Sequence, residues 1–187
     1  MKMPAMNDGD VALKLALELM HMPSRVRYVR AAPLPGGLDD LLCIAAGDET
    51  KAQHVASVLE RDPGLIAAAA RFFVEQILLA PDANCYRMLG AEQTASAASL
   101  RRNMALILRV LHPDVDRDGL SVLAGRVIGA WDQLKTPEKR RAYDQQLALR
   151  GGAHADHRRR MPARIRKRQT AKTGWLQKLA AVFGWNR

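Results

Sequence analysis

Hydrophobic residues recur at helical spacing along the first 80 residues of the chain. Leucines stand at every second position of residues 11–20, a pattern typical of a strand, but the Ala, Leu, Lys, Glu and Met content of this segment favours a helix. Asp48 and Asp62 are each placed to cap the start of a helix, and Gly47 is placed to end one. These signals predict helices over residues 11–20, 25–30, 38–45, 49–61 and 64–80.

The helix predicted over residues 64–80 is apolar on almost every side. A helix of this kind is buried between neighbours rather than laid on a surface. Its neighbours are the shorter helices before it, so we treat residues 1–81 as an N-terminal helical unit. The apolar spacing of this unit indicates helices that pack against one another. The unit contains no motif that predicts a function.

Residues 84–144 contain a second set of helical patterns around a short loop. A short helix at Tyr86 ends at Gly90, and an apolar stripe follows it. This stripe predicts a second, longer helix. Pro113 ends that helix, because proline lacks an amide hydrogen. Two stripes joined by a short polar loop predict an antiparallel helical hairpin, with His112-Pro113-Asp114 at its tip. The stripes are Leu100, Met104, Ile107 and Leu111, then Leu120, Leu123, Val127, Ala130 and Leu134.

This pattern resembles the J domain of the DnaJ cochaperone family over about a third of the chain. The resemblance implies a J domain over residues 82–147. It also implies a partner, a DnaK-type chaperone ATPase, whose ATP hydrolysis the J domain stimulates while client proteins are delivered. The matching residues are Tyr86, Leu89-Gly90, the stripe from Leu100 to Leu111, His112-Pro113-Asp114, Ala130-Trp131, Leu134 and the run from Pro137 to Asp144.

The resemblance also assigns roles by position. His112, Pro113 and Asp114 would form the contact that triggers hydrolysis in the partner. Arg101, Arg102 and Arg109 would form a basic face suited to an acidic docking surface, since complementary charge speeds encounter. Ala105 and Leu106, often basic in the family, are neutral here, and the family's zinc-binding repeats and Gly/Phe-rich linker are absent. The chain therefore resembles a J-domain-only cochaperone. The alternative is a non-chaperone adaptor with a J-like docking fold.

The net charge of +10 is confined to the end of the chain. Residues 157–187 contain ten Lys and Arg and no Asp or Glu, whereas the preceding residues contain 19 of each sign. Residues 1–156 carry no net charge, so the net positive charge of the chain does not indicate a nucleic-acid-binding domain. Dense like charge resists packing, so we expect residues 148–173 to be a disordered basic linker.

Residues 174–187 are predicted to form a short amphipathic helix behind the basic linker. Its apolar face carries aromatic anchors, a composition that binds an anionic membrane surface. Two alternatives stay open: the helix folds onto the protein's own core, or the arginines bind nucleic acid. The second is weaker, since no aromatic residues interleave with the arginines to stack on bases. The membrane-contact candidates are Trp175, Leu176, Leu179, Val182, Phe183 and Trp185.

The composition of the chain and the motifs that it lacks argue against several classes of protein. The chain is 48% hydrophobic but only 5% aromatic, which favours an all-α fold. Residues 114–119 mimic half of an EF-hand loop, but its twelfth position is Gly125 instead of glutamate, so we expect no metal site. No phosphate-binding glycine loop occurs, and His112 has no catalytic partners at useful spacing, so we expect neither an enzyme nor a cofactor. Without a recognisable signal peptide or disulfide framework, we expect a cytoplasmic protein, peripheral at a membrane if the tail binds lipid.

Overall fold

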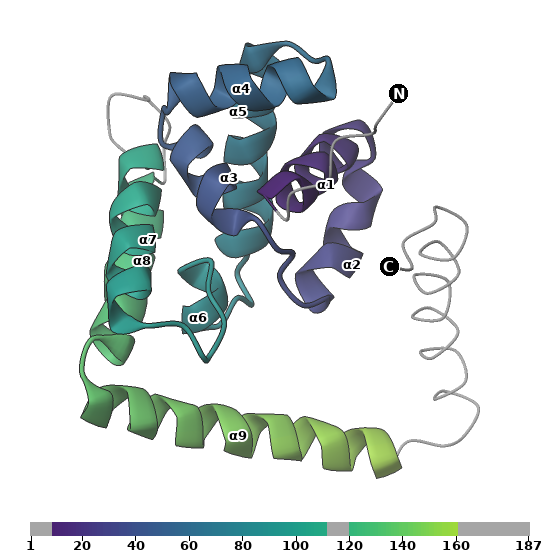
Figure 1. Ribbon diagram of the computed structural model, residues 1–187. Helices are drawn as coiled ribbons and strands as arrows, with labels where there is room; N and C mark the ends of the chain where they lie inside the picture. The colour runs from purple at the N-terminus through teal and green to yellow at the C-terminus, as the bar shows by residue number, and fades with distance from the viewer. Residues whose placement is uncertain (1–8, 112–119, 161–187) are drawn as a thin grey trace. The chain divides into compact units, whose positions relative to one another are not determined.

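The computed structural model describes residues 9–111 and 120–160 (Figure 1). Every regular element in these two ranges is a helix, which confirms the predicted all-α class. The chain forms two compact units, residues 1–140 and residues 141–187. The predicted division after residue 81 falls inside the first unit, and the predicted end of the J domain, residue 147, falls inside a helix.

The N-terminal helices are confirmed within a few residues of their predicted bounds. Asp48 caps α4 by accepting a hydrogen bond from the Lys51 amide at 3.0 Å, and Asp62 caps α5 in the same way from Leu65 at 2.9 Å. Gly47 ends α3 with a φ of 98°, in the left-handed region. The elements are α1 (Gly9–His21), the 3-10 turn η1 (Pro23–Arg25), α2 (Val26–Ala31), α3 (Leu38–Ala45), α4 (Glu49–Leu59) and α5 (Pro63–Phe73).

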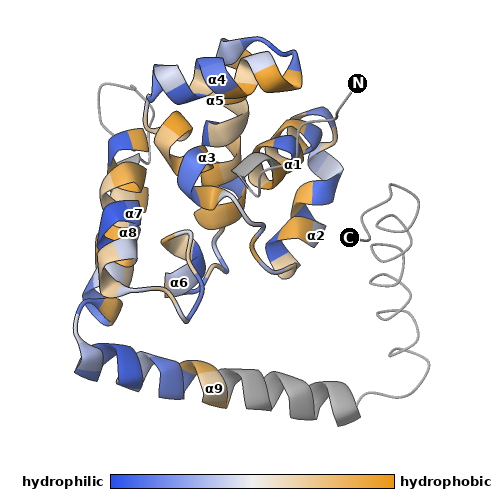
Figure 2. Ribbon diagram, viewed as in Figure 1, coloured by the Kyte–Doolittle hydropathy of each residue, from blue (hydrophilic) through white to orange (hydrophobic). Residues whose placement is uncertain are grey.

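Helix α5 is the centre of the first unit and packs against α1, α3 and α4. Ile66, Ala69, Ala70 and Phe73 are buried on it, and hydrophobic positions gather where α1, α3 and α5 meet (Figure 2). The prediction of burial on all sides is wrong for one stripe of this helix. The neighbouring helices cover this stripe only in part, so its residues stay exposed or half-buried. The exposed or half-buried stripe is Gly64, Ala67, Ala68, Arg71 and Phe72.

Helix α5 continues into a π-helical turn, η2 (Val74–Leu78), in which the Leu79 amide donates to the Val74 carbonyl at 3.0 Å. Residues 77–80 at the end of this turn are buried. A helix end leaves carbonyls without partners inside the helix, and buried carbonyls without partners are costly.

Three arginines from three other helices supply the missing donors at the end of η2. Arg30 of α2 donates to the Gln76 carbonyl at 2.7 Å. Arg126 donates to the Leu79 and Ala80 carbonyls at 3.0 and 2.8 Å. Arg87 donates to the Ile77 carbonyl at 3.4 Å and also to the carbonyls of Val29, in the last turn of α2, and of Ala32, directly after it. Burial lowers the pKa of Arg87, partly offset by Asp82.

The predicted helical hairpin is formed by α7 (Ala97–Val110) and α8 (Leu120–Leu134), which run antiparallel (Figure 1). It is preceded by the single-turn helix α6 (Cys85–Met88). Most of the two predicted stripes is buried, with Met104 and Leu123 half-buried. The fully or almost fully buried members are Leu100, Ile107, Leu111, Val127, Ala130 and Leu134.

Helix α9 (Pro137–Arg160) begins in the first unit and continues into the second. It passes through Gly151 and Gly152, where the sequence predicted a disordered linker, so that prediction is wrong up to Arg160. Each glycine costs about 1 kcal/mol in a helix interior, which alanines and arginines around the pair offset only in part. The rest of the linker and the predicted amphipathic helix, residues 161–187, lie outside the described residues.

Arg126→Met should destabilise the first unit. Methionine keeps the apolar stem but leaves two buried carbonyls without donors, so we expect a loss of about 2–3 kcal/mol in the free energy of unfolding. Urea unfolding measures this loss. Arg61→Met is the matched control, because Arg61 is exposed and should change stability by less than about 0.5 kcal/mol. Equal effects of the two substitutions would contradict this account of the arginine.

Gly90→Ala and Gly125→Ala should change stability in opposite directions. Gly90 has a φ of 58°, and a Cβ there would lie 3.3 Å from Leu42 Cδ1, so alanine should cost about 1–3 kcal/mol. Gly125 lies in α8 with no atom within 4 Å of an added Cβ, so alanine should stabilise by about 0.5–1 kcal/mol. Thermal unfolding of both variants tests the pair, and destabilisation by both would refute the distinction.

Candidate functional site

The candidate site is the hairpin of α7 and α8 with its connecting segment. Ser96 caps α7 by accepting a hydrogen bond from the Ser99 amide at 3.0 Å, and the helix ends at Val110. Leu111, only 3% exposed, fixes the end of the helix in the core. His112, Pro113 and Asp114 lie outside the described residues, so their predicted exposure at a tip stays a prediction.

All three arginines predicted to form the basic face of α7 are exposed. Arg102 and Arg109 are seven residues apart and lie on one side of the helix, because seven residues make nearly two turns. Arg101 is turned about 100° away from Arg102. The three side chains therefore occupy two sides of α7, and their role in docking stays a prediction.

Arg102 is engaged by a carboxylate from the N-terminal helices. Asp39, in the first turn of α3, accepts from its Nη2 at 2.5 Å, and this bond raises the pKa of Arg102. Asp40 makes a parallel pair with Lys51 of α4. Helix α3 also packs directly against α7. The N-terminal helices thus cover one flank of α7, and one of its three arginines, Arg102, forms an ion pair with them.

Asn103 joins α7 to the short helix before it. Its side chain is 3% exposed, and its amide nitrogen donates to the carbonyls of Leu89 and Gly90 at 3.1 and 3.3 Å. Among the described residues, none is a hydrogen-bond partner of its buried Oδ1 atom. Two carbonyls facing the side chain require a donor, and asparagine meets that need at the cost of one unpaired acceptor.

Arg140 holds the segment between α6 and α7. Its Nε donates to the Tyr86 hydroxyl at 3.0 Å, and its guanidinium lies 5.4 Å from the Tyr86 ring centroid. Its Nη2 also donates to the carbonyls of Gln93 and Ala95. Tyr86 and Arg140 both belong to the motifs that resemble the J domain, and here they fix the geometry at the base of the hairpin.

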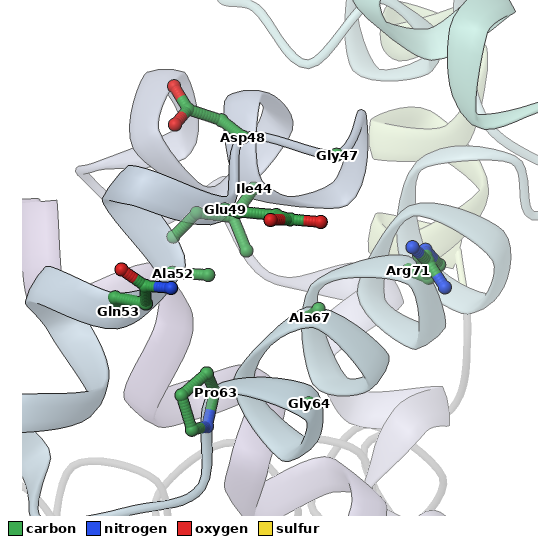
Figure 3. A pocket seen from close by; sticks show the side chains of 10 residues that line it. All are labelled: Ile44, Gly47, Asp48, Glu49, Ala52, Gln53, Pro63, Gly64, Ala67 and Arg71. Carbon is green, nitrogen blue, oxygen red and sulfur yellow. The ribbon is translucent and has the colours of Figure 1, made fainter.

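Two adjoining hollows follow the exposed stripe of α5. The first, about 300 Å³, lies between α3, α4 and α5, with Glu49 and Gln53 on one wall and Arg71 at its edge (Figure 3). The second shares Gly47 and Arg71 with the first and extends to Arg109 of α7. Arg71 could not be identified from the sequence, because a lone arginine in an apolar helix belongs to no motif.

The described residues contain neither a membrane-spanning helix nor a metal-binding cluster. Within that part of the chain, no helix has both the length and the apolar content needed to cross a bilayer. No cluster of three or more His, Cys, Asp or Glu side chains there is arranged to hold a metal ion.

Comparison with known proteins gives a partial match. Over 71 residues, the chain is 38% identical to human DnaJ homolog subfamily C member 16. The match covers 37% of this chain and only 9% of the length of that protein. No family model matches the chain. No solved structure matches it either. The similarity supports a relation to J-domain proteins, at the level of the domain and not of the whole human protein.

Proposed function

We propose that this protein is a J-domain cochaperone that recruits a DnaK-type chaperone and stimulates its ATP hydrolysis through His112, Pro113 and Asp114. The observation that carries the proposal is the match to a protein named as a DnaJ homolog. The antiparallel packing of α7 and α8 supports it, because the tripeptide stands in the segment that connects these two helices.

The proposed action needs no catalytic group in this chain. An activator of this kind shifts its partner toward the hydrolysing state by binding that state more tightly. A histidine, a rigid proline ring and a carboxylate provide a donor, a fixed turn and an acceptor for such binding. Exposed arginines on α7 would attract an acidic surface of the partner and orient it, because long-range charge attraction raises the association rate.

His112→Gln should abolish stimulation of the partner. We expect the intact protein to raise the single-turnover ATPase rate of a DnaK-type chaperone, and the variant to leave it at the basal rate. His54→Gln is the matched control, since His54 is an exposed histidine on α4, and it should stimulate like the wild type. Stimulation that survives His112→Gln would contradict the assigned trigger. A wild-type protein that does not stimulate would contradict the cochaperone proposal.

The second candidate is an adaptor tethered to an anionic surface, favoured by the concentration of ten basic and no acidic residues in the last 31 positions. Full-length protein should then float with vesicles containing anionic lipid and not with neutral vesicles. Replacing Arg158, Arg159 and Arg160 by glutamine should weaken flotation, because each basic residue near such a surface contributes about 1 kcal/mol. If DNA retains the protein and vesicles do not bind it, the result would favour nucleic acid as the surface that the tail binds.

A further inference from the structure

The hollow shared by the N-terminal helices and α7 has the form of a small docking surface. It encloses about 360 Å³ between α1, α3, α5 and α7. Its lining combines small or apolar side chains with two arginines, the principal ones being Met20, Ala46, Ala68, Phe72, Arg71 and Arg109. Phe72 is half-buried, so part of an aromatic ring is available to a ligand.

The two arginines give this hollow a positive character. Arg71 and Arg109 are both exposed, and Glu75 is the one acidic residue among the described residues of the lining. These three described side chains together carry one net positive charge. Arg71 is held in place by a long hydrogen bond from Nε to the Ala45 carbonyl at 3.4 Å. Its guanidinium places a positive charge in the hollow, and this charge attracts a carboxylate.

The arginines of α7 differ in their neighbours. Arg102 forms an exposed ion pair with Asp39, whereas Arg109 lines the same hollow as Arg71. Arg109 stands three residues before His112, a length of chain that spans at most about 11 Å. A partner that contacts the tripeptide therefore comes within reach of this hollow.

We infer that Arg71 of α5 and Arg109 of α7 together bind an acidic segment on the surface of the DnaK-type chaperone. The inference rests on the proposed function and extends it. The docking surface is composite, with one cation from the hairpin and one from the N-terminal helices. The N-terminal helices thereby contribute to the choice of chaperone, because a surface split between two parts of the chain demands a partner that matches both.

The test compares two substitutions of Arg71 in the full chain. Arg71→Gln removes the charge, and Arg71→Lys keeps the charge but loses the guanidinium and its bond to Ala45. With the ATP-bound chaperone, we measure the dissociation constant and the cochaperone concentration that gives half-maximal ATPase stimulation. Arg71→Gln should raise both about fivefold and leave the maximal rate unchanged, whereas Arg71→Lys should stay within about twofold of wild type.

Arg61→Gln is the matched control, because it removes the charge of another exposed arginine that does not line this hollow. It should bind like the wild type, and urea unfolding of all three variants checks that the fold is kept. Equal binding by Arg71→Gln and Arg61→Gln would overturn the inference while wild-type stimulation still supported the proposed function. Equal weakening by Arg71→Gln and Arg71→Lys would also overturn it, since that result indicates a structural role. A wild-type chain that neither binds nor stimulates would overturn both.

Discussion

The described part of the first unit depends on the hydrogen bonds that arginines make to the carbonyls at the buried end of η2. A helix that ends in the core cannot leave these carbonyls to water, so each needs a donor from elsewhere in the chain. Arg30, Arg87 and Arg126 come from α2, α6 and α8 and meet this need together. The same hydrogen bonds join the N-terminal helices to the hairpin. The donors that the end of η2 needs therefore also fix how the N-terminal helices and the hairpin pack together.

The packing of α3 against α7 carries this connection to the candidate site. In the hairpin alone, α7 would present its arginines independently of the rest of the chain. Here Asp39 holds one of them, and Arg71 stands in the same hollow as another. The electrostatic surface offered to a partner is therefore a property of the whole first unit. It cannot be read from the segment that resembles the J domain.

Local signals predicted the helices and their ends, because capping and helical spacing act over a few residues. Asp48, Asp62 and Gly47 behave as their positions indicate. The arginine bonds could not be predicted, since all but the bond from Arg87 to Ile77 join residues 46 to 58 positions apart and arginine has no preferred partner in a sequence. The exposed stripe of α5 was missed because alanine and glycine suit a core and a surface equally well. The tripeptide was singled out together with the flanking motifs that resemble the J domain, and its exposure stays a prediction.

The choice of arginine at the joint around η2 has a consequence for acid and alkali tolerance. Lysine or histidine in these positions could lose its proton when desolvated, and the carbonyls would then lose their donors. Burial does lower the pKa of Arg87, but a guanidinium begins so far above neutrality that it stays protonated in water at any pH a cell maintains. Changes in pH within the range that a cell maintains should therefore leave the hydrogen bonds at this joint in place.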